Sequence, residues 1–182
     1  MLKVFKTDSV DKKIKKLKKI TTDCWIDLTS PTMDEIDKVA QKTQVNKELI
    51  MKMLDVEELP RVEQDNNATL VVIDTPYYEE EYEYATYPLG IIITDNNYVI
   101  TVSPRKVNVL EDFKQDKVRN FRTAKKVRFL IQILLKTSNN YLKALKQVNN
   151  DKNYLVAIQS KYYNVSDLID AETDNLDHKL NI

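Results

Sequence analysis

The sequence predicts an α/β protein, with a mixed α/β body over residues 1–120 and long helices over residues 121–182. Three observations support this class. Several short apolar runs resemble strands, one helix start carries a capping motif, and the chain of 182 residues contains a single glycine, Gly90. Helix interiors exclude glycine, so its scarcity indicates long helices. With 42% apolar residues the chain can also build a substantial core.

The first elements expected along the chain are two strands and two helices. Residues 3–6 and 24–28 have the apolar character of strands, and turn-forming residues follow the second run. Thr32 and Glu35 have the spacing of a capping box, which predicts the start of the first helix. A shorter helix is expected to begin near Asn46 because apolar residues recur there at helical spacing.

Three further strands are expected from Thr69, Thr86 and Asn97, with a hairpin turn at 95–97. The centres of the first two are apolar without alternation, which indicates a sheet covered on both faces. The acidic, tyrosine-rich run 77–84 is expected to be a solvated connection.

A long helix is expected over residues 122–149, which contain neither glycine nor proline. Apolar or small residues recur there every seven positions, which predicts a coiled-coil-like seam. The seam residues are Val127, Leu130, Leu134, Thr137, Tyr141, Ala144 and Val148. A second long helix, with Leu155, Tyr162, Ile169 and Leu176 at the same spacing, is expected beyond a turn at 149–153.

Composition excludes several classes of site. Cys24 is the only cysteine and His178 the only histidine, so the usual zinc sites, cysteine–histidine nucleophiles and serine–histidine–aspartate triads lack parts. One glycine cannot supply a phosphate-binding glycine-rich loop. Cys24 is expected to be a buried thiol. No run of ~20 apolar residues and no secretory signal is present, so a soluble protein in the cytosol is expected.

The charges are sorted along a chain whose net charge is zero. Residues 1–20 carry eight lysines against two aspartates, and residues 105–128 carry nine basic against three acidic residues, so each block is net +6. Residues 55–65, 77–84 and 165–182 are each net −4. This alternation favours contacts between modules or subunits over nucleic-acid binding, for which a basic protein would be expected.

Four segments, in order and spacing, resemble the cytoplasmic domain of the CorA family of magnesium transporters. They are CWIDLTSPTMDEID from Cys24, LDVEELPRVEQDNNATLVVIDTP from Leu54, YPLGIIITDNNYVITVS from Tyr87 and KKVRFLIQILLKTSNNYL from Lys125. The resemblance implies an α/β/α sandwich with a mixed sheet between helical layers, on the cytoplasmic side of the cell membrane. It also implies a homo-oligomer, a pentamer in the intact family, and transport of Mg²⁺, or of Co²⁺ or another divalent cation.

The resemblance stops short of the family's pore. The transmembrane helices and their Gly-Met-Asn signature are absent, since Gly90 is followed by Ile91. We therefore expect a soluble regulatory part that does not conduct ions and whose partner is the transmembrane pore segment of the full-length protein. The acidic pair that holds the family's regulatory metal is replaced here by Met51 and Lys52.

Other carboxylates could hold a Mg²⁺ ion instead, because this hard cation prefers oxygen ligands and keeps several waters. Acids that repel one another across an interface would be bridged by a dication, which would draw the subunits together. The candidate ligands are Asp55, Glu57 and Glu58 on one side and Asp167, Asp170, Asp174 and Asp177 on the other. The structural alternative is that these acids are hydrated surface, with Glu63 paired to Arg61.

The leading hypothesis is thus a non-enzymatic, magnesium-sensing domain that self-associates and binds no nucleic acid. One alternative is a magnesium-dependent enzyme that acts on a phosphorylated substrate. It would need the strand-end acids Asp27, Asp74 and Asp95 to converge in one cleft. The other is an interaction module that binds a polyanion through residues 105–128.

Overall fold

The computed structural model of the chain describes residues 1–78 and 84–149. The chain divides into two compact units, Met1–Tyr141 and Leu142–Ile182. The sheet, the helices that cover it and both hydrophobic cores belong to the first unit. The sequence-based domain boundary at residue 120 stays a prediction.

A seven-stranded sheet forms the centre of the first unit, with the order β2-β1-β3-β7-β6-β5-β4. β3 and β7 pair in parallel and all other neighbours are antiparallel, so the sheet is mixed. The strands are β1 (Leu2–Thr7), β2 (Ile14–Leu17), β3 (Trp25–Thr29), β4 (Arg61–Asp65), β5 (Ala68–Tyr78), β6 (Tyr84–Thr94) and β7 (Val99–Ser103).

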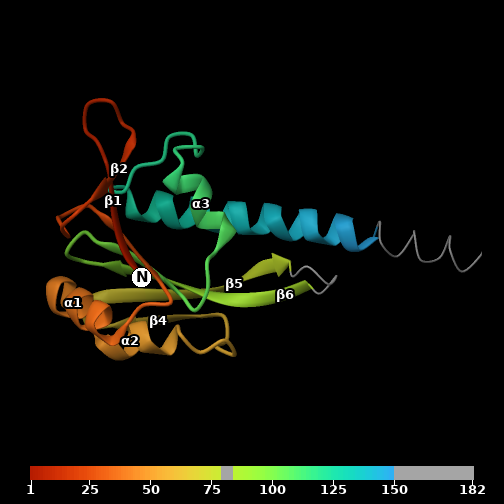
Figure 1. Cartoon of the computed structure of the whole chain (residues 1–182), viewed down its shortest axis with the longest axis horizontal. Helices are drawn as coiled ribbons and strands as arrows, with labels where there is room; N and C mark the ends of the chain where they lie inside the picture. Colours follow the sequence, from red (N-terminus) through yellow and green to blue (C-terminus); the bar gives the residue numbers. More distant parts are fainter. Residues whose placement is uncertain (79–83, 150–182) are drawn as a thin grey trace, which may run out of the picture. The chain divides into compact units, whose positions relative to one another are not determined.

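Helices cover both faces of this sheet (Figure 1). On one face lie α1 (Met33–Thr43) and α2 (Lys47–Lys52). On the other lie α3 (Asn108–Lys114) and the start of a helix that runs from residue 126 through residue 149, called the C-terminal helix below. The expected α/β/α sandwich with a mixed sheet between helical layers, followed by a long helix, is therefore confirmed.

Alternation along β3 divides the interior into two cores, because successive side chains of a strand point to opposite faces. Ile26 and Leu28 join the core under α1 and α2, where Ile36 and Ile50 are fully buried. Trp25 enters the other core, where its ring meets those of Phe5, Phe113, Phe121 and Phe129 at centroid distances of 5.1–6.4 Å. Cys24 is buried, as expected, and burial raises the pKa of its thiol.

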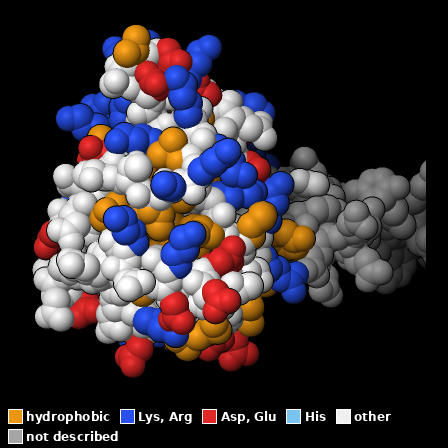
Figure 2. Space-filling model, turned by 60° about the vertical axis from the view of Figure 1, so that its left-hand side comes forward, with side chains coloured by type: hydrophobic (Ala, Val, Ile, Leu, Met, Phe, Trp, Pro, Cys, Tyr) orange, Lys and Arg blue, Asp and Glu red, His pale blue; other side chains and the backbone are white. Residues whose placement is uncertain are grey.

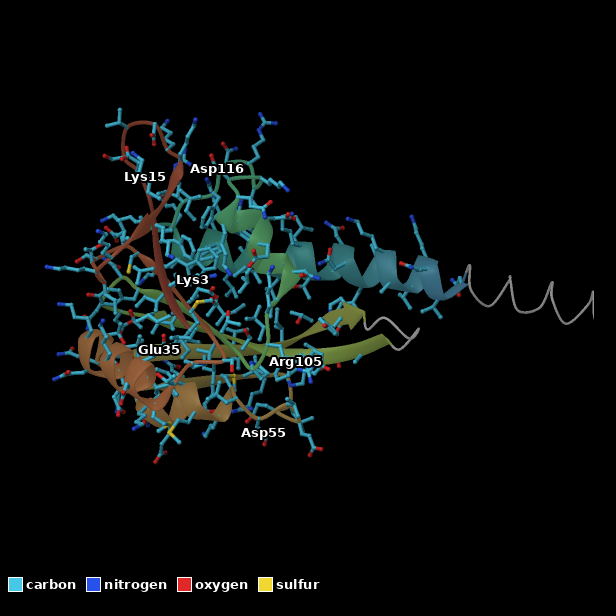
Figure 3. All side chains as sticks on the ribbon, viewed as in Figure 1. Lys3, Lys15, Glu35, Asp55, Arg105 and Asp116 are labelled. Atoms are coloured by element: carbon cyan, nitrogen blue, oxygen red, sulfur yellow. The ribbon has the colours of Figure 1, made fainter. Side chains whose placement is uncertain are left out.

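The predicted capping box starts α1 and also fixes the beginning of the chain. Thr32 Oγ1 accepts a hydrogen bond from the backbone N–H of Glu35, and the Glu35 carboxylate accepts from the N–H of Thr32. The same carboxylate accepts from the N–H of Leu2 at 2.7 Å and lies 3.0 Å from the N-terminal ammonium (Figure 3). Burial alone would raise the pKa of Glu35, but these donors outweigh it and lower the pKa.

The predicted seam of the C-terminal helix is wrong in part. The helix begins at residue 126, and its buried residues are Phe129, Ile133 and Thr137, spaced four apart. Val127 is 65% exposed and Leu134 37% exposed, although both were assigned to the seam. A single straight helix on a sheet buries a stripe with the 3.6-residue period, which the seven-residue spacing does not follow. The second predicted helix lies outside the described residues, as does the centre of the acidic connection 77–84.

Gly90 allows α2 to end against the sheet. A Cβ atom added at this position would lie 2.5 Å from Sδ of Met53, which is fully buried. We expect Gly90→Ala to lower the free energy of unfolding by about 1–3 kcal/mol, because the Met53 side chain must move within a packed core. Urea denaturation followed by circular dichroism measures this. In a Met53→Ala background the same Gly90→Ala change should cost little. If it lowers the free energy of unfolding there as much as in the natural chain, the contact with Met53 is not responsible.

Candidate metal site at the end of α2

The acidic stretch, residues 55–65, begins just after the end of α2. Met53, the C-cap of α2, is buried, and the backbone N–H of Asp55 donates to the carbonyl of Lys52 at 3.2 Å. Residues 55–60 form turns and an extended stretch, and β4 starts at Arg61. The stretch therefore places its acids on the surface between a helix end and the first residues of the edge strand, with Asp55 beside the end of α2 (Figure 3).

Two of the acids are neutralised within the fold. Arg61 forms an ion pair with Glu58 and a second one with Glu63 at 3.1 Å. Lys52 Nζ lies 3.1 Å from the other carboxylate oxygen of Glu63. The hydrogen bonds from Lys52 and Arg61 lower the pKa of Glu63. The predicted pairing of Glu63 with Arg61 is thus confirmed, and Glu58 is less available to a metal ion than the sequence suggested.

Asp55 and Glu57 are the exposed acids of the stretch. Asp55 Oδ1 accepts a hydrogen bond from the backbone N–H of Glu57 at 3.0 Å, which holds the turn. Among residues 1–78 and 84–149, no lysine or arginine forms an ion pair with either carboxylate. Both groups therefore keep free oxygen atoms that a cation or a neighbouring subunit could use.

The structure leaves the predicted ligand set untested. In the described part of the chain no three histidine, cysteine, aspartate or glutamate residues converge in a way that could hold a metal ion. Asp167, Asp170, Asp174 and Asp177, proposed to face the stretch, lie outside the described residues. Met51 is exposed and Lys52 is paired with Glu63, so neither position offers a carboxylate oxygen to a cation.

The three aspartates that the enzyme alternative needs in one cleft lie apart. Asp74 pairs with Pro88 in the β5–β6 ladder, whereas Asp95 follows Thr94, the partner of Ala68. Asp74 lies six positions further along β5 than Ala68, which corresponds to ~20 Å along a strand. Asp27 lies in the core, 1% exposed and paired with Lys114. No single cleft can therefore use all three acids.

The basic block 105–128 is divided among internal contacts. Lys114 pairs with Asp27 and Glu111, and Lys126 donates to the carbonyl of Thr94 at 2.6 Å. Arg122 donates to the carbonyl of Lys12 at 3.3 Å. These contacts leave fewer cations for a polyanion than the sequence count suggests, which weakens the interaction-module alternative.

The buried pair of Asp27 and Lys114 was not predicted from the sequence. Asp27 Oδ2 lies 2.7 Å from Lys114 Nζ, and Asp27 Oδ1 accepts a hydrogen bond from Thr101 Oγ1 at 3.0 Å. Thr101 in turn accepts from Trp25 Nε1 at 2.9 Å. An aspartate inside the apolar strand Trp25–Thr29 was a signal for a buried partner, but nothing in the sequence indicated which lysine supplies it.

No helix in the described part of the chain has an apolar stretch long enough to cross a lipid bilayer. The chain is 33% identical over 86 residues to the cobalt/magnesium transport protein CorA of Methanocaldococcus jannaschii, which covers 47% of this chain and 26% of that protein. The chain thus spans about a quarter of the length of this curated relative.

Solved structures show the same fold. The soluble domain of CorA from Methanocaldococcus jannaschii matches with a TM-score of 0.69 and 24% identity, over 86% of this chain and 65% of that one. The complete CorA magnesium transporter of the same organism matches with a TM-score of 0.69 and 23% identity, over 83% of this chain and 48% of that one. The ZntB cytoplasmic domain from Vibrio parahaemolyticus matches with a TM-score of 0.61 and 12% identity, over 82% of this chain and 63% of that one.

The family model for CorA-like Mg²⁺ transporter protein matches residues 22–157, which is more than half of the chain. This range contains the acidic stretch at the end of α2, five strands of the sheet and the C-terminal helix from residue 126 through residue 149. The chain therefore belongs to the family of CorA-like Mg²⁺ transporter proteins.

Proposed function

We propose that this chain is a regulatory, magnesium-sensing domain of a CorA-like divalent-cation transporter, on the cytoplasmic side of the cell membrane. It would control the passage of Mg²⁺, or of Co²⁺ or another divalent cation, through the transmembrane pore segment of the full-length protein. Membership of the CorA family and the likeness to the soluble domain of a CorA protein support this role.

One observation carries the sensing part of the proposal. Asp55 and Glu57 are exposed at the end of α2, while the neighbouring Glu58 and Glu63 are paired with cations of the same fold. Carboxylates whose charge is not compensated repel similar groups on an approaching surface. A Mg²⁺ ion, which binds through one or two carboxylates and retained waters, would replace this repulsion with a bridge. Cation binding would then favour the associated state.

The second half of the bridge is proposed to come from Asp167, Asp170 and Asp174. They belong to the acidic segment 165–182, net −4, which matches the net −4 of residues 55–65. Two segments of like charge come together only where cations neutralise them. The carboxylates in these positions would belong either to the same chain or to a neighbouring copy.

The experiment compares thermal unfolding with and without MgCl₂, against NaCl at equal ionic strength. A ligand present at ten times its dissociation constant stabilises the folded state by about 1.4 kcal/mol. We expect that gain for the natural chain and its loss in Asp55→Asn/Glu57→Gln. The matched control is Asp34→Asn/Glu48→Gln, which removes the same two charges from exposed helix starts.

The control should keep the Mg²⁺ response of the natural chain. Asp167→Asn/Asp170→Asn/Asp174→Asn should lose it in the same way as Asp55→Asn/Glu57→Gln. A natural chain whose unfolding is the same in MgCl₂ and NaCl would contradict the sensing role. An equal response in all variants would contradict this choice of ligands.

Self-association is proposed to use an apolar stripe of the C-terminal helix. The stripe consists of Val127, Ile131, Leu134 and Leu135, all exposed and spaced to lie on one face of a helix. Apolar residues gathered on an exposed helix face favour contact with another apolar surface. A second copy of this chain is the proposed occupant, as expected for a family that forms pentamers.

Sedimentation velocity over a range of protein concentrations tests this contact. We expect the natural chain to form oligomers and Ile131→Glu/Leu135→Glu to remain monomeric, because two buried carboxylates would oppose association. Arg128→Glu, an exposed neighbour on the same helix, is the control and should change assembly little. Monomers at every concentration for the natural chain would contradict the proposal.

A further inference from the structure

A pocket of about 380 Å³ lies between the start of β1, the segment after β2 and the exposed side of α1. Its walls are polar and basic, and its floor is apolar. The lining residues are Leu2, Val4, Lys18, Lys19, Ile20, Lys38, Gln41 and Lys42. Figure 2 shows the side of the molecule that is at the left in Figure 1, where lysine and arginine side chains surround apolar ones.

Four lysines line this pocket, and no aspartate or glutamate does. In residues 1–78 and 84–149, none of the four lysines forms an ion pair, although other lysines nearby do. Lys38 and Lys42 are one helical turn apart, and like charges at this spacing destabilise a helix. The fold therefore gathers four positive charges at one pocket without neutralising them, which favours an anionic ligand.

A second basic pocket shows the contrast. It has a volume of about 610 Å³ and is lined by five basic residues, but also by Asp8 and Asp23. Lys15 pairs with Asp8 at 2.7 Å, and Lys6 donates to the carbonyl of Thr22 at 2.8 Å. Much of its positive charge is thus satisfied within the protein. The four lysines of the smaller pocket form no such ion pairs within the described part of the chain.

The floor of the smaller pocket indicates the rest of the ligand. Leu2 and Ile20 are partly buried and Val4 is 5% exposed, so an apolar surface lies beneath the charges. A simple inorganic anion would leave this surface unused. Ligand pockets of roughly 300–1,000 Å³ accommodate small organic molecules. Lysine binds phosphate as a mobile point charge, so no glycine-rich loop is needed.

We propose that this pocket binds an anion that carries one or more phosphate groups on an apolar or aromatic body. Phosphate oxygens would lie among Lys18, Lys19, Lys38 and Lys42, and the body would rest on Leu2, Val4 and Ile20. A soluble nucleotide and the headgroup of an acidic phospholipid share this chemistry. The proposal is independent of the magnesium site, because it uses the opposite charge and different elements.

Binding of ATP to the full chain is measured by isothermal titration calorimetry in EDTA, so that no Mg²⁺ takes part. We expect binding of ATP and none of adenosine, which lacks phosphate. Inorganic triphosphate should bind more weakly than ATP, since it cannot use the apolar floor. In Lys18→Gln/Lys42→Gln the affinity should fall about tenfold or more, because two direct charge contacts are lost.

The matched control is Lys12→Gln/Lys125→Gln in the larger pocket, which removes the same net charge. It should change the affinity for ATP about twofold or less, the effect expected of screened long-range charge. A loss equal to that of Lys18→Gln/Lys42→Gln would show non-specific attraction and overturn the site. Equal binding of inorganic triphosphate and ATP would overturn the role of the floor.

Cosedimentation with vesicles distinguishes the two sources of phosphate. Vesicles of phosphatidylcholine alone are compared with vesicles that contain phosphatidylglycerol. Binding of only the second kind, sensitive to Lys18→Gln/Lys42→Gln and not to the control, would identify a lipid headgroup as the ligand. If neither ATP nor phosphatidylglycerol vesicles bind, the proposal is wrong.

Discussion

Replacing Lys114 with methionine is expected to lower the free energy of unfolding by about 3–5 kcal/mol. Lys114 is the cation that compensates a carboxylate in the centre of the sheet: Asp27 is 1% exposed and Lys114 10% exposed at their side chains. Among the described residues no donor other than Lys114 reaches Asp27 Oδ2. Without Lys114 the fold must bury an unpaired charge or protonate it.

The electrostatics of the pair indicate that it is formed at neutral pH. Burial alone would lower the pKa of Lys114, but the charge of Asp27 and hydrogen bonds to Asp27 and Glu111 outweigh it and raise the pKa above 10.5. A pKa that is raised in the folded state contributes stability below its unfolded value. The contribution is therefore complete at pH 7 and is lost only as pH rises through the folded pKa.

Two variants isolate this pair in urea denaturation at pH 7, followed by circular dichroism. Asp27→Leu/Lys114→Met removes both charges and should be more stable than Lys114→Met alone, because no carboxylate is left unpaired. Lys136→Met breaks the more exposed pair of Lys136 and Asp112 and should cost about 1 kcal/mol or less. If the loss of unfolding free energy in the double variant equals the sum of the losses in Asp27→Leu and in Lys114→Met, the two charges are not coupled.

Elements with a local signal could be predicted from the sequence. The capping box of Thr32 and Glu35, the N-cap Asn46 and the apolar centres of β5 and β6 are decided by neighbouring residues. β2 was missed because its two central residues are lysines and it has only one apolar residue at each end. Its position follows from the backbone ladder to β1, which residue type does not reveal.

The sequence predicted where the acids at the end of α2 lie and one of their ion pairs, whereas metal binding by these acids stays a prediction. Sequence placed the acids at the end of a helix and paired Glu63 with Arg61, as observed. It did not show that Arg61 also holds Glu58, or that Lys52 reaches Glu63 from the preceding helix. These ion pairs depend on how the turn between α2 and β4 brings the two elements together. The partner acids of the proposed bridge are more than one hundred residues away, beyond the reach of local patterns.

Phe129→Ala is the second change with a large expected effect, a loss of about 3–5 kcal/mol in the free energy of unfolding. Phe129 is fully buried, and its ring lies 5.1 Å from that of Trp25, 5.0 Å from Phe113 and 4.6 Å from Phe121, measured between centroids. Truncation would leave a cavity among three rings that cannot all move to fill it. It would also remove the first anchor of the C-terminal helix on the sheet.

Val127→Ala is the matched control on the same turn of the same helix, since Val127 is 65% exposed. Its cost should stay within about 0.5 kcal/mol at protein concentrations low enough to keep the chain monomeric. Fluorescence of Trp25, the only tryptophan, gives a second measurement, because Phe129 contacts its ring and Val127 lies outside this core. Emission should shift for Phe129→Ala alone. Equal losses for both variants would contradict the burial of Phe129 and the exposure of Val127 on which this prediction rests.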